Sequence, residues 1–121
     1  MLDLETLRRR KDILERVDWE LTPQEAVEMF DHRARGQAER FRIRDPAEKR
    51  YFFCVDNWHE APRLVLKERS IKEARVVAEI RVPEDLLSEC VGKFGNRKGL
   101  FPLTGELSRW LSELLFSTVR P

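Results

Sequence analysis

The spacing of apolar residues changes twice along this 121-residue chain, and these changes restrict the fold more than any other feature. Residues 4–34 carry apolar side chains at helical spacing, residues 50–82 carry them in runs or at alternate positions, and residues 86–115 return to helical spacing. A helical repeat indicates one buried side of a helix, whereas alternation indicates a strand. The chain is therefore predicted to form a single α+β domain.

The first part, residues 1–36, is predicted to be a helical hairpin. Asp3 can cap the first helix. Its apolar stripe, which largely repeats every seven residues, consists of Leu7, Leu14, Val17 and Leu21. The sequence TPQE at residues 22–25 then starts a second helix as a capping box, and Gly36 can end it. Residues 37–49 follow as an arginine-rich connection.

Residues 50–82 are predicted to form a three-stranded antiparallel meander. The run YFFCV is apolar throughout, as in a strand covered on both faces, and RLVLKE follows as a second strand. The third strand shows regular alternation in RVVAEIRV. Residues 70–78 allow a second interpretation, because SIKE is also a capping box. We expect a turn and then a strand, since the alternation is rich in valine.

Residues 83–121 are predicted to form two helices packed on one face of that sheet. Pro83 and the acidic residues after it can open the first of these helices, and Gly95 can end it. Thr104 can cap the last helix. The apolar stripe of that helix consists of Leu107, Trp110, Leu111, Leu114 and Leu115.

Two stretches of the chain resemble a small family of uncharacterised bacterial proteins. VDWELTPQEAVEMF at residues 17–30 is similar to the family's DW-x-x-TP-x-EAV opening, and WLSEL at residues 110–114 is similar to its WL-x-EL close. After the second helix this chain has DHRARGQAE, where the family has an aromatic, glycine-rich segment. The resemblance supports the helix boundaries and implies no activity.

Total charge points to no polyanionic partner, because 23 Lys and Arg balance 22 Asp and Glu. The exception is segment 33–44, where Arg33, Arg35 and Arg40 belong to an arginine cluster that suits nucleic acid or another acidic partner. The first 50 residues nevertheless hold 12 basic and 12 acidic side chains. That balance favours ion pairing over a continuous positive surface.

A second basic segment is the glycine loop at residues 92–99, which carries Lys93, Arg97 and Lys98. Glycines and backbone N–H groups before a helix can hold a phosphate. However, LFPL separates this loop from the helix that follows, and the spacing matches no nucleotide-binding motif. We expect these glycines to separate two helices, with the basic residues free to contact a partner.

The motif DNWHE at residues 56–60 follows a predicted strand and places Trp58 and His59 at its end. Asp56 could orient His59 as a general base. Asp-Asn is equally typical of a turn, and no activated serine or cysteine motif accompanies the pair. We therefore expect a hairpin turn and no enzymatic activity, with Trp58 and His59 as candidates for partner contact.

Cys54 and Cys90 each lie in an apolar run, which predicts two buried thiols in a reducing cytoplasm. With His32 and His59 they would be the usual zinc ligands, but none of the four is closely paired, so we expect no metal and no cofactor. No apolar run approaches the roughly 20 residues that span a bilayer, and the amino terminus lacks signal-peptide order. These features predict a cytoplasmic protein without membrane contact.

The sequence thus favours a non-catalytic protein-interaction or structural module. The alternative is an anion- or nucleic-acid-binding module that uses segments 33–44 and 92–99. We also expect a homodimer through Leu7, Leu14 and Val17, because the two carboxyl-terminal helices compete for the single helix-bearing face of the sheet. Coverage of these leucines by the second helix is the other possibility.

Overall fold

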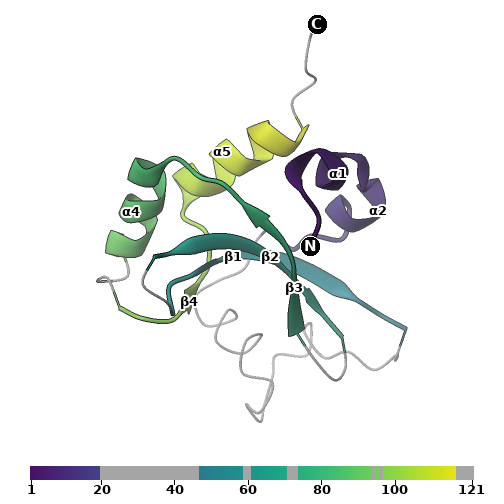
Figure 1. Ribbon diagram of the computed structural model, residues 1–121, viewed down its shortest axis with the longest axis horizontal. Coiled ribbons are helices and arrows are strands. Elements are labelled where there is room, and N and C mark those ends of the chain that lie inside the picture. The colour runs from purple at the N-terminus through teal and green to yellow at the C-terminus, as the bar shows by residue number, and fades with distance from the viewer. Residues whose placement is uncertain (20–46, 59–60, 71–73, 94, 96, 117–121) are drawn as a thin grey trace, which may run out of the picture.

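The computed structural model describes residues 1–19, 47–58, 61–70, 74–93, 95 and 97–116 (Figure 1). Within these ranges the helices are α1 (Leu4–Arg9), α2 (Lys11–Leu14), α4 (Glu84–Lys93) and α5 (Gly105–Phe116). The strands are β1 (Arg50–Asp56), β2 (Arg63–Arg69), β3 (Ala74–Ile80) and β4 (Leu100–Phe101). They form one antiparallel sheet in the order β3-β2-β1-β4. The α+β class is therefore confirmed.

The sheet contains the predicted meander and one strand more. β1, β2 and β3 pair consecutively, and residues 74–78 are strand, which confirms the turn-and-strand interpretation for that part of 70–78. The prediction of only three strands was wrong, because Leu100 and Phe101 pair with Asp56 and Val55. A two-residue strand is too short to show alternation, so the sequence pattern gave no sign of it.

The first predicted helix is also shorter than its apolar stripe suggests. The backbone leaves the helical region at Arg10 (φ −91°, ψ 73°), and α2 ends at Leu14. At this break, two nitrogens of the Arg10 guanidinium, Nε and Nη2, each donate a hydrogen bond of 2.9 Å to the Asp12 carboxylate. The predicted second helix and residues 37–46 of the connection lie outside the described residues.

The caps predicted from local sequence are present. The Thr6 N–H donates to Asp3 Oδ1 at 2.7 Å, and the Leu107 N–H donates to Thr104 Oγ1 at 3.3 Å. Gly95 has a φ of 70°, in the left-handed region that favours glycine at a helix end. In the described part of the chain, no helix is both long and apolar enough to cross a membrane.

The four described helices lie together on one face of the sheet, and the main core fills the space between them (Figure 1). Alternate strand residues such as Phe53, Val55 and Leu66 point into this core. Leu7, Leu14 and Val17 are only 0%, 5% and 8% exposed there. The predicted dimer stripe is therefore wrong as an interface: α1 and α2 are short enough to share the face with α4 and α5.

The segment containing α1 and α2 crosses this face from one edge of the sheet toward the other. At its start, the Leu2 N–H donates to the Val77 carbonyl of β3 at 2.8 Å. At its end, the Asp18 N–H donates to the Tyr51 carbonyl of β1 at 2.8 Å, beside a bridge between Val17 and Tyr51. The amino-terminal segment is thus fixed to β3 and to β1.

Candidate functional site

Trp58 lies just beyond the end of β1 with 59% of its surface exposed. The preceding Asp56 is buried and already used: one carboxylate oxygen accepts the Trp58 N–H at 3.0 Å, and the other accepts Arg63 Nη2 at 3.0 Å. Asp56 therefore acts as a turn residue and an ion-pair partner. His59 lies outside the described residues, so the structure does not place it relative to Asp56.

Asn57 joins this turn to the glycine loop. Its backbone N–H donates to the Gly99 carbonyl at 2.8 Å, and its side-chain Nδ2 donates to the Arg97 carbonyl at 2.8 Å. Two segments that are separate in the sequence therefore meet at one end of the molecule. This end, which we call the tryptophan tip, presents Trp58, Arg97 and Lys98, all exposed. Lys93, at the end of α4, is exposed too, whereas Arg33, Arg35 and Arg40 lie outside the described residues.

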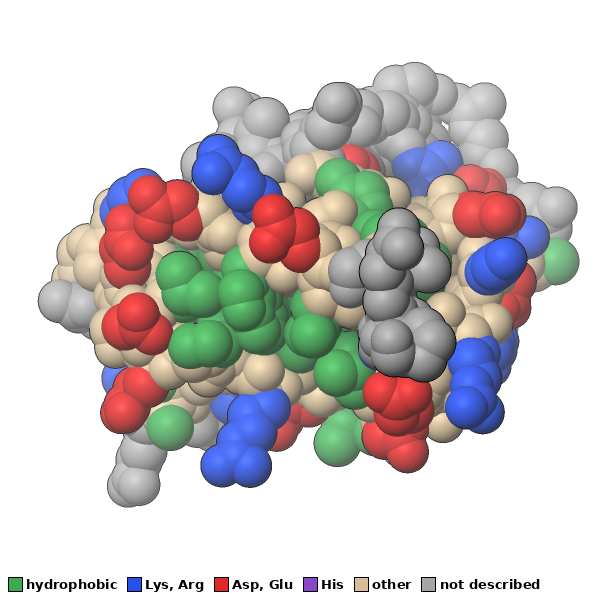
Figure 2. All heavy atoms as spheres, turned by 90° about the horizontal axis from the view of Figure 1, so that it is seen from above, with side chains coloured by type: hydrophobic (Ala, Val, Ile, Leu, Met, Phe, Trp, Pro, Cys, Tyr) green, Lys and Arg blue, Asp and Glu red, His purple; other side chains and the backbone are tan. Residues whose placement is uncertain are grey.

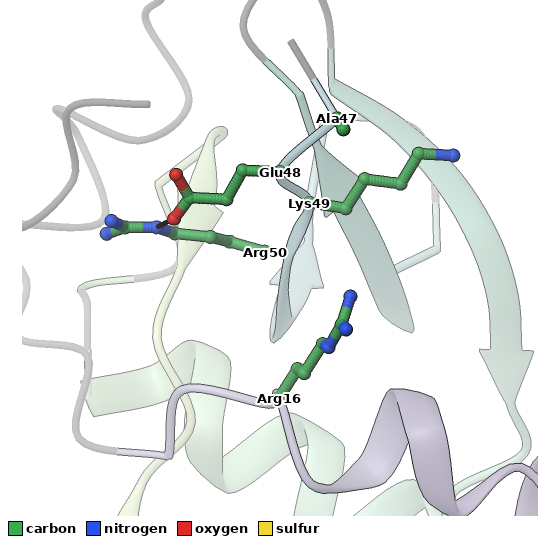
Figure 3. Close-up of a pocket in the computed structure, with 5 residues that line it drawn as sticks. All are labelled: Arg16, Ala47, Glu48, Lys49 and Arg50. Carbon is green, nitrogen blue, oxygen red and sulfur yellow. Dashed lines mark hydrogen bonds and ion pairs between the residues drawn. The ribbon is translucent and has the colours of Figure 1, made fainter. Parts of the chain in front are cut away.

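A basic basin of about 570 Å³ lies where the chain enters β1, and sequence reasoning missed it (Figure 3). Its wall includes Arg16, Glu48, Lys49 and Arg50. In Figure 3 the Arg16 side chain extends into the basin, while Glu48 holds the Nε of Arg50 at 3.0 Å. Lys49 lies 3.5 Å from Glu68. Since ion pairs engage Lys49 and Arg50, the basin is a weaker anion site than its number of basic residues suggests.

A row of polar side chains crosses the helix-bearing face of the sheet at the margin of the main core. Tyr51 and Arg75 are the cross-strand neighbours of Glu68 on either side. The Tyr51 hydroxyl donates to Glu68 Oε2 at 2.8 Å, and Arg75 Nε donates to Oε1 at 3.0 Å. A depression of about 330 Å³ opens beside the row. Because its carboxylate is fully engaged, Glu68 is held as a structural acceptor.

The same contacts set the ionisation of this row. Burial raises the pKa of Tyr51 to about 12, and its hydrogen bond to the Glu68 carboxylate adds to the effect. Burial also acts to raise the pKa of Glu68, but the hydrogen bonds from Tyr51 and Arg75 outweigh it and hold the pKa below its usual value. The row therefore stays as neutral tyrosine and ionised glutamate at neutral pH.

The two thiols lie on opposite sides of the sheet. Cys54 packs with Phe52 and Val65 on the face away from the described helices, and Cys90 belongs to the main core. Both are free and buried. Burial raises the pKa of Cys54 to about 12 and also raises that of Cys90. Among the residues described here, no group of three His, Cys, Asp or Glu is placed to hold a metal ion.

The helix layer carries an apolar surface over α4 and α5. Figure 2 looks down on this layer and shows hydrophobic side chains gathered where α4 and α5 lie, with acidic side chains along the outer edge. The partly buried apolar residues of these helices are Leu86, Leu87, Trp110 and Leu114, and we call them the α4/α5 apolar face. The core beneath covers one side of each residue and leaves the other exposed.

Fold and surface together define an α+β domain whose described residues include a partly exposed apolar helix surface and a basic tip with an exposed tryptophan. Comparison of the chain with family models, with curated proteins and with solved structures gives no match to any of them.

Proposed function

We propose that this protein is a non-catalytic protein-interaction module whose binding surface is the α4/α5 apolar face. The observation that carries the proposal is the hydrophobic surface that Figure 2 shows over α4 and α5, two helices that carry four partly buried large apolar side chains. Trp110 and Leu114 are four residues apart on α5 and so lie next to each other on its surface. Contiguous apolar surfaces rimmed by polar residues are typical of protein-binding sites.

The apolar stripe of α5 is wider than the side of the helix that the core buries. Leu107, Leu111 and Leu115 are buried against the sheet at a spacing of four residues. Trp110 and Leu114 extend the stripe sideways, beyond the part of the helix that the core covers. A partner that covers these two side chains would bury further apolar surface, worth less than the about 1.5–3 kcal/mol of a fully exposed side chain, because the core already covers part of each. Aromatic residues are also prominent among the residues that dominate binding energy.

The test is affinity capture from a lysate of the native cell with three forms of the protein: wild type, Leu86→Ser and Leu4→Ser. Leu4 on α1 is also a partly buried leucine at the margin of the main core, so its replacement is a matched control. We expect wild type and Leu4→Ser to retain the same proteins and Leu86→Ser to lose them. Equal retention by all three folded forms would contradict the proposal.

The tryptophan tip favours a second candidate function, the binding of an anion or a nucleic acid. The Asn57 hydrogen bonds place Trp58 beside a loop with two exposed basic residues. Aromatic side chains next to cations can stack on bases and neutralise phosphates. Titration with a labelled single-stranded oligonucleotide tests this candidate: binding should weaken with salt and be lost in Trp58→Ala. Unchanged binding in Trp58→Ala would exclude the tip.

A further inference from the structure

The charges around the α4/α5 apolar face are strongly one-sided. The exposed charged residues of α4 and α5 comprise five acids and two bases, a local balance of −3, whereas the whole chain has a net charge of +1. The acids are Glu84, Asp85, Glu89, Glu106 and Glu113, and the bases are Lys93 and Arg109. An apolar surface with this rim attracts a positively charged partner.

These five acids also differ from most acids elsewhere in the described structure. Outside α4 and α5, ion pairs hold six of the nine described acidic side chains: Glu5, Asp12, Glu48, Asp56, Glu68 and Glu79. Among the described residues, no ion pair joins any acid of α4 or α5 to a base. Within the described residues, their negative charge is therefore not neutralised by ion pairs, and these acids lie on the same two helices as the apolar face.

The acids stand next to the apolar side chains that a partner would cover. On α5, Glu113 precedes Leu114 and lies one turn after Trp110. On α4, Asp85 precedes Leu86, and Glu89 lies one turn after Leu86. A partner that packs on the leucines would bring its own flanking residues close to these carboxylates. Basic residues there would form contacts at the rim, and acidic residues or phosphates would be repelled.

We infer that the segment docking on the α4/α5 apolar face is a basic amphipathic helix of a protein partner, with leucine-like residues on one side and lysine or arginine beside them. This inference rests on the proposed function and specifies its partner. A helix presents apolar side chains at intervals of three and four residues, which suits a surface built from two neighbouring helices. The net negative rim disfavours nucleic acid and anionic lipid at this face.

The direct test uses two designed peptides of equal length with identical leucine positions. One carries lysine on its polar side and the other carries glutamate, and binding to the full chain is measured by fluorescence anisotropy. We expect the lysine peptide to bind at least about tenfold more tightly at low salt, and this advantage to shrink as salt is added. Equal binding by the two peptides would overturn the inference.

Variants that neutralise acidic residues show which carboxylates attract the lysine peptide. Glu89→Gln with Glu113→Gln should weaken binding of the lysine peptide about tenfold, because two neighbouring rim charges are lost. The matched control, Glu5→Gln with Glu15→Gln, removes two exposed carboxylates from the amino-terminal segment and should leave binding unchanged. An equal effect of both pairs would overturn the inference, since only the total charge would then matter.

The variant Leu86→Ser separates this inference from the proposed function. If the two peptides bind equally and both lose affinity in Leu86→Ser, the face binds proteins but does not select basic helices. If neither peptide binds, the basic-helix inference fails, while the capture experiment with Leu86→Ser still decides the proposed function. Tight binding of the lysine peptide that is indifferent to Leu86→Ser would place its site elsewhere and overturn the inference as well.

Discussion

The two faces of the sheet are built from alternate residues of the same strands, yet the described residues form cores of very different size on them. On the helix-bearing face, Phe53, Val55 and Leu64 belong to one cluster of sixteen buried residues. On the opposite face, the buried cluster consists of Phe52, Cys54 and Val65. Because side chains alternate along a strand, neighbours such as Leu64 and Val65 belong to different cores. The helix-bearing face therefore contributes most of the apolar burial among the described residues.

Two neighbouring buried charges on β2, Glu68 and Arg69, have very different surroundings. At the margin of the main core, Glu68 is buried but accepts hydrogen bonds from Tyr51 and Arg75. Its neighbour on β2, Arg69, points to the opposite face and is only 5% exposed, yet its Nε and Nη1 atoms have no hydrogen-bond partner among the residues that the structure describes. Arg69 also faces Arg50 across the strand pair. Glu68 is thus a compensated buried charge, whereas Arg69 is an uncompensated one among the described residues.

The largest expected effect comes from matched valines in the two cores. Val55 and Val65 are both 0% exposed, one in each cluster. We expect Val55→Ala to lower the free energy of unfolding by about 2.5 kcal/mol and Val65→Ala by about 1.5 kcal/mol, because the cavity in the larger core has more neighbours and collapses less. Denaturant titrations measure both. Equal losses would show that the two cores are equally rigid.

The next prediction concerns the buried guanidinium of Arg69. Arg69→Met keeps most of the apolar volume and removes the buried guanidinium, so it should raise the free energy of unfolding by about 1–2 kcal/mol. The control Arg50→Met removes a half-buried arginine that is paired with Glu48, and it should change stability by less than about 1 kcal/mol. A loss of stability in Arg69→Met would show that a counter-charge meets Arg69 in solution.

The polar row should give a smaller effect that depends on pH. Tyr51→Phe removes one hydrogen bond from Glu68 and should cost about 1 kcal/mol at neutral pH. The folded pKa of Tyr51 is about 12, above its ordinary 10.0, so the wild type should lose stability as pH rises through this range. Tyr51→Phe should lack that alkaline loss. Because Tyr51 is the only tyrosine, its phenolate absorbance reports the titration directly.

At acidic pH, Glu68 in the same row gives stability the opposite dependence on pH. The folded pKa of Glu68 is lowered, so its contribution to stability is present above its ordinary pKa of 4.5 and is lost as pH falls below that value. Replacement by Gln should flatten this part of the stability profile. A profile that keeps the same slope in Glu68→Gln would assign the acid sensitivity to other carboxylates.

The smallest effect is expected outside both cores. Trp58 is 59% exposed and lies beyond the end of β1, so Trp58→Ala should change the free energy of unfolding by less than about 0.5 kcal/mol. Thermal unfolding followed by circular dichroism measures the change. A loss above 2 kcal/mol would mean that the indole is part of a core, and Trp58 would then be unsuitable as a test of the tryptophan tip.

Local signals in the sequence predicted much of the fold. Asp3, Thr104 and Gly95 were assigned correctly because caps and helix stops depend on neighbours within four residues. The order of β1, β2 and β3 followed from three consecutive segments with strand-like patterns, of which the first is a continuous apolar run and the third alternates. The break at Arg10 was missed because neither Pro nor Gly marks it, and the stripe of Leu7 and Leu14 continues across it.

The candidate sites were less predictable, because they depend on contacts between distant segments. The tryptophan tip exists through the bonds of Asn57 to Arg97 and Gly99, some forty residues away in the chain. The basin joins Arg16 to Arg50 in the same way. The α4/α5 apolar face did have a signal in the sequence: Trp110 and Leu114 widen the stripe of the last helix beyond what one buried side requires.

The attachment of the amino-terminal segment has a consequence for how this sheet behaves at high protein concentration. Exposed strand edges are templates for pairing with other chains and hence for aggregation. Here Leu2 occupies a backbone position on the outer edge of β3, while Asp18 and β4 occupy positions along the outer edge of β1. The amino-terminal segment thus also covers part of the outer edges of β3 and β1. Its detachment would expose strand edges that can pair with further copies of the chain.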